Sequence, residues 1–222
     1  MKLSAETLAI LKNFAEINGN LTIKPGNVIK TLAESRNIHA TAQVAEVFEH
    51  TFGFYDIREF LATLAMFPDP ELTFSEECVD ISDNTDSSLF AKYYSANIAI
   101  LTRVPELKQF PKEDVKFLVS KTNFNRISRA CATLKCPDVK FRGGNGKIEA
   151  IVYDGTNATK NTFTIDISKE YDGEPFSVHL KEKRLMLIDG DYECSIISNR
   201  VLMCKNTEQE LEYIITLDVD TN

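Results

Sequence analysis

The sequence lacks tryptophan, has only three histidines and five cysteines, and contains no long uninterrupted apolar run. A membrane-spanning helix needs about 18 consecutive apolar residues, so none is predicted, and residues 1–6 do not resemble a signal peptide. The cysteines are odd in number and follow no repeating pattern, which favours reduced thiols over a disulfide framework. We therefore expect a soluble protein that stays inside a cell and is not secreted.

Catalytic and metal-binding patterns are also scarce. The glycine-rich segment 143–147 ends in a lysine but lacks the Ser or Thr that follows it in a P-loop, so a hairpin turn is favoured. Alternating carboxylates at Asp189, Asp191 and Glu193 could hold a cation, yet a solvated turn is the simpler interpretation. The histidines lie far apart, without acidic or cysteine companions at ligand spacing: His39, His50 and His179. We predict no catalytic residue, no metal site and no cofactor.

What the chain does contain is a repeated pattern. Its 222 residues, 43% of them hydrophobic, suit two globular domains. A strand, a helix and three strands recur four times at a period of about 50 residues. The predicted helical segments are residues 2–17, 56–66, 112–133 and 178–188, and residues 1–3 are the only candidate for the first leading strand. The last segment is weaker than the others, because it combines the end of a strand over 176–180 with a short helical turn over 181–187. The pattern predicts an α+β fold with a domain over 1–94, a connector over 95–111 and a second domain over 112–222.

The third predicted helix has an internal conflict. Its first half would bury Val115, Leu118 and Val119, and its second half a stripe that includes Ile127 and Cys131. The two stripes are about 120° out of phase, because an α-helix turns by about 100° per residue. One straight helix cannot bury both, so we predict a kink or break over residues 122–125.

Charge is distributed unevenly along the chain. The whole sequence has 25 basic and 33 acidic residues, a net charge of -8, which by itself argues against nucleic-acid binding. The four predicted helical segments, however, carry 11 basic and 7 acidic residues, a net of +4, which leaves -12 for the remainder. One interpretation of this positive charge is the ordinary outer face of amphipathic helices, which carries charged residues. The other is a cationic face directed toward phosphates.

Several segments, in order along the whole chain, resemble the DNA polymerase sliding clamps of T-even-type bacteriophages: residues 1–4, 11–18, 55–61, 126–129 and 171–174. The resemblance implies a DNA-clamp fold and a homotrimeric ring, with helices lining a central hole and antiparallel sheets outside. It implies that the ring encircles duplex DNA without sequence preference and tethers the DNA polymerase. It further implies an ATP-driven clamp loader, a role with host RNA polymerase through a late sigma-like factor and co-activator, and a location in the cytoplasm of the infected bacterium.

The resemblance and the charge pattern together suggest three sets of residues. The predicted DNA-facing residues are Lys2, Lys12, Lys112, Lys116, Lys121, Arg126, Arg129, Lys181, Lys183 and Arg184. The predicted subunit interface consists of Leu89, Phe90, Tyr93 and Tyr94 on one side and Phe163, Ile165 and Ile167 on the other. The predicted pocket for partner peptides, beside the connector, consists of Ile98, Ile100, Leu101, Val104 and Leu217.

Two other classes of function remain to be weighed against a clamp. One is a non-replicative oligomeric adaptor of clamp-like architecture, whose cationic helices would bind acidic proteins. The other is an enzyme, for example a hydrolase that uses Asp189 and Glu193. Retention on circular DNA but not on linear DNA would distinguish a clamp from an adaptor, and converging carboxylates in a pocket would indicate an enzyme.

Overall fold

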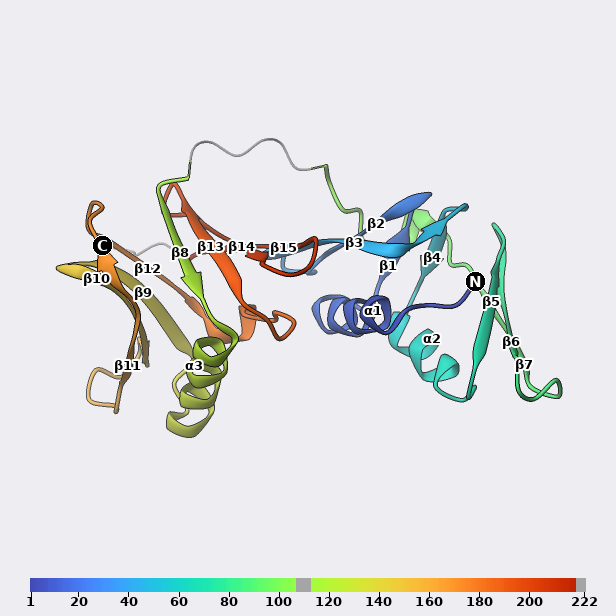
Figure 1. The fold of residues 1–222 in the computed structure, drawn as a ribbon, viewed down its shortest axis with the longest axis horizontal. Coiled ribbons are helices and arrows are strands. Elements are labelled where there is room, and N and C mark those ends of the chain that lie inside the picture. Colours follow the sequence, from blue (N-terminus) through green and yellow to red (C-terminus); the bar gives the residue numbers. More distant parts are fainter. Residues whose placement is uncertain (107–112, 219–222) are drawn as a thin grey trace. The chain divides into compact units, whose positions relative to one another are not determined.

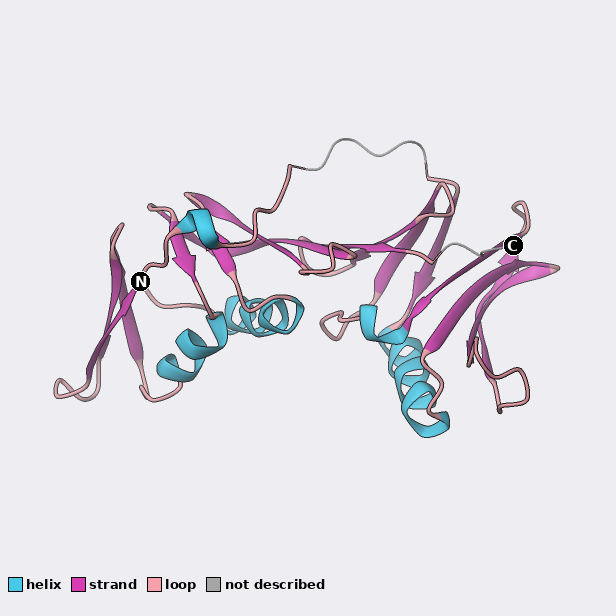
Figure 2. Ribbon diagram, turned by 180° about the vertical axis from the view of Figure 1, so that it is seen from behind, coloured by secondary structure: helices cyan, strands magenta, loops and turns pink. Residues whose placement is uncertain are grey.

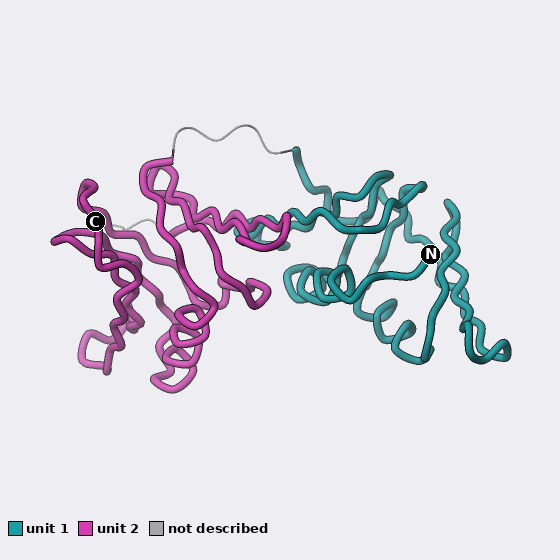
Figure 3. Tube along the Cα trace, in the orientation of Figure 1, with its two compact units in different colours: residues 1–106 teal, residues 107–222 magenta. Residues whose placement is uncertain are grey.

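The computed structural model describes residues 1–106 and 113–218, which fall into two compact units, residues 1–106 and 107–222 (Figure 3). Each unit consists mainly of antiparallel strands with few, short helices (Figure 2). The described part of the predicted connector, residues 95–106, belongs to the first unit. Among the described residues, no helix has the length and apolar character needed to cross a membrane.

Unit 1 contains two α-helices (Figure 1). Its elements are α1 (Ala5–Ile17), β1 (Leu21–Ile23), β2 (Gly26–Leu32), β3 (Ile38–Phe48), β4 (Phe52–Phe54), α2 (Ile57–Leu64), β5 (Pro70–Phe74), β6 (Cys78–Asp83), β7 (Phe90–Tyr94) and the 3-10 helix η1 (Ile98–Ile100). Strand β1 pairs with β4, β2 with β3, and β6 with both β5 and β7, all antiparallel.

Both α-helices of unit 1 begin directly after a residue whose side chain caps the helix. The Ser4 side chain accepts a hydrogen bond from the Thr7 N–H (3.2 Å), and the Asp56 carboxylate accepts one from the Arg58 N–H (3.0 Å). Each bond satisfies an N–H group that has no partner inside the helix. Ser4 and Asp56 are therefore the N-caps of α1 and α2.

An aromatic cluster forms much of the core of unit 1. The Phe54 ring lies 4.8 Å from both the Phe52 and the Phe60 ring, and the Tyr93 ring lies 5.4 Å from Phe60, measured between ring centroids. The three phenylalanines are fully buried. Because the four rings come from β4, α2 and β7, the cluster fixes α2 against the strands that flank it.

The described residues of unit 2, 113–218, form one α-helix and two four-stranded sets of strands (Figure 1). Its elements are β8 (Val115–Val119), α3 (Lys121–Leu134), β9 (Asp138–Gly144), β10 (Gly146–Tyr153), β11 (Phe163–Tyr171), β12 (Phe176–Lys181), the 3-10 helix η2 (Glu182–Arg184), β13 (Tyr192–Ile197), β14 (Val201–Asn206) and β15 (Leu211–Thr216). One set has the order β11-β10-β9-β12, and the other β8-β13-β14-β15.

The prediction of a helix over residues 112–133 is wrong in its first half. Val115, Phe117 and Val119 are buried and alternate with exposed Lys116 and Leu118, which is the period of a strand, and this segment is β8. The two apolar stripes are out of phase because one belongs to a strand and the other to a helix. The break falls at the cap of α3, Ser120, rather than over residues 122–125.

The predicted start of the fourth unit, a strand over residues 176–180 followed by a short helical turn over residues 181–187, is confirmed in its order, and the turn is shorter than predicted. Strand β12 continues to Lys181, and only the three-residue η2 follows it. The hairpin predicted at the glycine-rich segment is confirmed, because residues Gly144, Asn145 and Gly146 turn β9 into β10 with positive φ angles of 151°, 52° and 80°.

The fourfold order of elements is present despite these corrections. Its leading segments are residue Met1 and the strands β4, β8 and β12, and each is followed by a helix or helical turn and three strands. Within each unit, the leading strand of one repeat pairs with a strand of the other repeat: β4 pairs with β1, β8 with β13, and β12 with β9. Met1 does the same with β5, because its ammonium donates to the Leu72 carbonyl (2.6 Å) and its carbonyl accepts from the Leu72 N–H (2.8 Å). These pairings join two repeats into one compact unit.

Candidate nucleic-acid interface and apolar groove

Helix α3 is the cationic helix of the described structure. Its sequence contains Lys121, Arg126 and Arg129 and no carboxylate, a net charge of +3. Ile127 and Cys131 are buried on the side that packs against β10 and β11, whereas both arginines are exposed and make no ion pair with any described residue. An exposed, unneutralised pair of guanidinium groups is suited to phosphate contacts.

The amino-terminal end of α3 is held by the loop before β13. The Asp191 carboxylate accepts a hydrogen bond from the Lys121 N–H (2.7 Å), and the Lys121 ammonium lies 3.0 Å from the Asp189 carboxylate. Phe124 also makes an edge contact with the Tyr192 ring, with centroids 5.8 Å apart. Two of the three carboxylates of the alternative cation site, Asp189 and Asp191, therefore stabilise the first turn of α3, and Glu193 lies 3.4 Å from the Lys116 ammonium instead.

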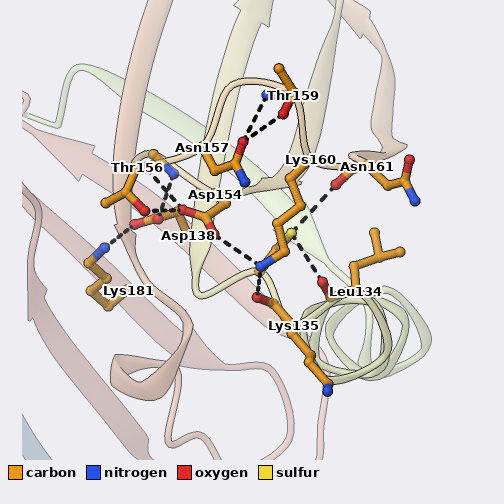
Figure 4. A network of polar contacts seen from close by, with 12 residues as sticks. Leu134, Lys135, Asp138, Asp154, Thr156, Asn157, Thr159, Lys160, Asn161 and Lys181 are labelled. Carbon is orange, nitrogen blue, oxygen red and sulfur yellow. Dashed lines mark hydrogen bonds and ion pairs between the residues drawn. The ribbon is translucent and has the colours of Figure 1, made fainter.

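The carboxyl-terminal end of α3 is held by the loop 154–161 (Figure 4). Lys135, at the C-cap, adopts a left-handed φ of 53°, and its carbonyl accepts a hydrogen bond from the Lys160 ammonium. Lys160 also lies 3.0 Å from Asp154. Hydrogen bonds from Thr156 and the ion pair with Lys160 hold the pKa of Asp154 well below its usual range. The position of the arginines of α3 is thus determined at both ends of the helix.

Five of the predicted DNA-facing residues are engaged with carboxylates of the same chain. The ion pairs are Lys2 with Asp69 (2.7 Å), Lys116 with Glu113 (2.7 Å), Lys121 with Asp189 (3.0 Å), Lys181 with Asp138 (2.6 Å) and Arg184 with Asp218 (2.7 Å). Hydrogen bonds to these carboxylates raise the pKa of Lys2 and of Lys116. Their charge is largely neutralised locally, so these residues are weaker candidates for phosphate contacts than the sequence indicated.

Two of the five have a clear structural role. Lys181 neutralises Asp138, whose side chain is only 4% exposed and also accepts a hydrogen bond from the Gly155 N–H (2.9 Å; Figure 4). Arg184 donates to the Thr216 carbonyl (2.9 Å) and its side chain is 16% exposed. Both side chains hold strands of unit 2 together.

The remaining predicted DNA-facing residues differ from one another. Lys12 on α1 and Lys183 on η2 are exposed and, like Arg126 and Arg129, form no ion pair with the residues that the structure describes. Lys112 lies outside the described residues. Helix α2 contributes little positive charge, as expected, because Arg58 pairs with Asp56 (2.8 Å).

The predicted subunit-interface residues lie on or beside two strands at sheet edges. Within the described residues, β7 pairs only with β6 and β11 only with β10. Phe90 and Tyr94 are 62% and 69% exposed. Tyr93 faces its own core, since its hydroxyl donates to the Asp56 carbonyl (3.2 Å). The others are half-buried: Leu89, Phe163, Ile165 and Ile167.

A groove with a cavity volume of about 700 Å³ lies between β2 and the segment after β7. Ile98, Leu101 and Val104 line it, as predicted for a peptide pocket, together with Val28 of β2. Ile100 is 63% exposed and does not line the groove. Leu217 does not line it either, because it is only 3% exposed in the core of unit 2, where its N–H donates to the Arg200 carbonyl.

Close backbone contacts fix the groove-lining segment on unit 1. The Ala96 N–H donates to the Gly53 carbonyl (2.8 Å), and a Cβ at Gly53 would lie 2.7 Å from the Ala96 oxygen and 2.8 Å from Leu101. Only glycine allows this approach. The Asn18 amide, at the end of α1, donates to both Thr102 (3.0 Å) and the Leu32 carbonyl (2.8 Å). The groove is therefore preformed.

The rim of the groove is charged, which the sequence did not reveal. Lys24, Lys30 and Arg103 contribute three positive charges, and Glu106 contributes one negative charge. The Glu106 carboxylate lies 2.7 Å from the Lys30 ammonium and 3.9 Å from that of Lys24. The hydrogen bond from Lys30 lowers the pKa of Glu106. Residues of β2 and of the connector meet only in the folded chain, so no sequence signal marks this rim.

The fold is that of DNA clamps. Solved clamps superpose on nearly the whole chain at low sequence identity: proliferating cellular nuclear antigen (PCNA) from Entamoeba histolytica (TM-score 0.66, 11% identity, 96% of this chain and 94% of that one), PCNA from A. fulgidus bound to the C-terminal region of FEN-1 (0.70, 12%, 97% and 96%), and the Helicobacter pylori beta clamp bound to a DNA ligase peptide (0.70, 11%, 98% and 64%).

Sequence relatives give the family. No protein-family model matches the chain. The sliding clamp of Vibrio phage KVP40 is 32% identical over 201 residues, which cover 88% of this chain and 90% of that protein. The sliding clamps of Escherichia phage RB69 and Enterobacteria phage T4 are 23% and 25% identical over the full chain and 98% of their own lengths. The chain belongs to the sliding clamp family, and its function is that of a ring clamp that tethers DNA polymerase.

Proposed function

We propose that three copies of this chain close into a ring around duplex DNA, through pairing of β7 of one protomer with β11 of the next. The observation that supports this is the unpaired outer edge of each strand within the described residues. Exposed strand edges promote association, and head-to-tail pairing that closes after three copies uses both edges in every protomer. Exposed Phe90 and Tyr94 add apolar contact at this junction.

Arg126 and Arg129 are the main contacts to the phosphates of the enclosed duplex, with Lys12 and Lys183 as further contacts. A topological ring needs no base contacts and requires weak phosphate attraction, because it must slide. Five other predicted DNA-facing residues are tied to carboxylates, which limits the attraction. The role is mechanical, and no residue of the chain acts in catalysis.

The apolar groove of unit 1 receives a peptide segment of the DNA polymerase. Among the solved clamps of the same fold, two carry bound peptides or regions of DNA-processing proteins, FEN-1 and DNA ligase. A preformed, mainly apolar groove suits such short segments. The same groove serves the late sigma-like factor and co-activator that link the clamp to host RNA polymerase.

A closed ring needs a separate device to enter circular DNA, and this is the role of an ATP-driven clamp loader. The loader opens one of the junctions between protomers and places the ring at the primer. The relatives are phage proteins, so the clamp works in the infected bacterial host.

Solution mass and DNA retention test the ring. The expected mass is about 75 kDa, three times the chain mass of 25.0 kDa. Phe90→Asp should give monomers. The control is Val47→Asp, at a strand position as exposed as Phe90 (62% for both), and it should leave the trimer intact. Loaded rings should stay on nicked circular DNA and leave it after linearisation. Equal retention on both forms, or a persistent monomer, would exclude the ring.

A further inference from the structure

We propose that Asp189 takes the place of a DNA phosphate inside the protein, and that Lys121 exchanges between Asp189 and the phosphates that pass along α3 as the clamp slides. The exchange rests on the proposed function, in which α3 contacts the duplex, and it adjusts the strength of that contact. Asp189 is therefore a residue that determines how firmly the clamp holds DNA, although it repels DNA itself.

The cations of α3 lie on two sides of the helix. Arg129 is opposite the buried stripe, with Arg126 beside it, and neither makes an ion pair with a residue that the structure describes. Lys121 and Ser128 are seven residues apart, or about two turns, so they share one flank of α3. This flank lies about 80° from Arg129 around the helix axis, because each residue turns by about 100°.

Carboxylates from η2 and from the loop before β13 border that flank. The Glu182 carboxylate accepts a hydrogen bond from the Ser128 hydroxyl (2.7 Å), and the Asp191 carboxylate accepts one from the Lys121 N–H (2.7 Å). The Asp189 carboxylate lies 3.0 Å from the Lys121 ammonium. Of these three carboxylates, Asp189 is the one whose partner is a long side chain that can turn toward another anion.

The ion pair between Lys121 and Asp189 is free to open. The two side chains are 53% and 64% exposed, and an ion pair at such an exposed position is weak and screened by salt. A cavity of about 220 Å³, lined by both residues and by Asn125, lies beside the pair and gives the side chains room to move. A phosphate oxygen accepts the same hydrogen bonds from an ammonium group as a carboxylate oxygen, so it can replace Asp189.

The exchange distinguishes Lys121 from the two arginines of α3. When a phosphate moves past Arg126 or Arg129, the guanidinium group returns to water. Lys121 returns to Asp189, so that each contact with DNA that is lost is replaced by a contact within the protein. The energy of the contact then varies less along the duplex, which favours sliding over arrest at one position.

Binding to a short duplex at several salt concentrations tests the role of Asp189 in the full-length clamp. Asp189→Asn should steepen the slope of log affinity against log salt by about 0.9 for each protomer whose α3 contacts the duplex, because Lys121 gains a phosphate contact. The control is Asp172→Asn, which removes an exposed carboxylate between β11 and β12 and should leave the slope unchanged. An unchanged slope in Asp189→Asn, or equal slopes in the two variants, would overturn the proposal.

A double-mutant cycle shows whether Asp189 acts through Lys121. In a Lys121→Gln background, Asp189→Asn should no longer alter the slope. An effect of the same size in that background would mean that Asp189 only repels DNA, and would refute the exchange. Arg126→Gln/Arg129→Gln separates this proposal from the proposed function: a slope that falls in the arginine variant but stays constant in Asp189→Asn refutes the exchange alone, whereas constant slopes in both refute the contact of α3 with DNA as well.

Tracking of single loaded clamps on stretched DNA tests the effect on sliding. Asp189→Asn should diffuse along the duplex about 2- to 5-fold more slowly than wild type, because Lys121 then has no partner within the protein to return to. Asp172→Asn should diffuse as wild type does. Equal diffusion of wild type and Asp189→Asn would refute the role of the exchange in sliding.

Discussion

The Ser128 hydroxyl donates a hydrogen bond to the Glu182 carboxylate at 2.7 Å, and so joins the middle of α3 to the turn η2. η2 stands where the fourfold repeat places a fourth helix. The segment that lacks this helix therefore supports the cationic helix of the same unit instead of repeating it. The predictions below separate residues that hold α3 and its neighbours in place from residues that are free to contact a ligand.

Lys181→Met should destabilise the fold. The substitution leaves the buried Asp138 carboxylate with the Gly155 N–H but without its counter-ion. We expect the free energy of unfolding to fall by about 2–3 kcal/mol, since removal of one partner leaves a buried charge uncompensated. Urea denaturation measures the change. Lys183→Met, at an exposed and unpaired position, should change it by less than about 0.5 kcal/mol; equal effects would contradict the structural role of Lys181.

Arg126→Gln/Arg129→Gln should weaken DNA binding without loss of stability. Each lost phosphate contact lowers the slope of log affinity against log salt by about 0.9, so the double variant should lose about 1 to 2 in slope for each protomer whose α3 contacts the duplex. Binding of the variant to a short duplex, titrated at several salt concentrations, measures this. Arg36→Gln, at an exposed turn of unit 1, is the control and should leave the slope unchanged. An unaltered slope in the double variant would remove α3 from the DNA contacts.

Asp83 should make stability fall in acid. Hydrogen bonds from Thr85 and from the N–H groups of Asp69, Thr85 and Asp86 lower its pKa from 3.8 to about 2. The folded state therefore binds this proton less readily than the unfolded state, so the contribution is complete above about pH 4 and is lost as the pH falls toward 2. Unfolding measured from pH 2 to 6 should show wild type and Asp83→Asn converging at the acid end. A difference independent of pH would contradict the prediction.

Cys78 should be the first thiol to react in the native protein. It is half-buried, whereas the other four cysteines are buried. Burial raises the pKa of Cys131 to about 12 and that of Cys194 well above its usual range. Because the thiolate is the reactive form, alkylation of these two with iodoacetamide at pH 8 should be at least about tenfold slower than that of Cys78. Peptide mass spectrometry at timed intervals reports each site, and unfolding in guanidinium should make all of them react alike.

Local signals predicted much of the fold correctly. Ser4 and Asp56 cap helices through bonds to nearby N–H groups, which depend on neighbouring residues alone. The strand Val115–Val119 resembles a helix in sequence because Leu118 completes a helical stripe with Val115 and Val119. Its pairing with β13, far along the chain, determines the strand, and the sequence alone does not show that partner.

The residues of the candidate site also divide into those that the local sequence predicts and those whose role depends on distant segments. Arg126 and Arg129 are exposed on a helix that the apolar stripe of Ile127 and Cys131 already predicts. Lys181 and Arg184 have the same charge and a similar sequence context, but they contact Asp138 of β9 and Asp218, which follows β15. Charge counting along the sequence cannot separate a cation directed to solvent from one that neutralises a distant carboxylate.

The sequence by itself determined the repeated α+β order, the helix caps, the glycine hairpin and the absence of a metal or nucleotide motif, because each depends on residues close together in the chain. Tertiary structure alone decided which cations are unpaired, which strand edges are open, and how Lys24, Lys30 and Glu106 surround one groove. These properties arise from contacts between segments far apart in sequence, and electrostatic interactions depend on the distances that folding sets.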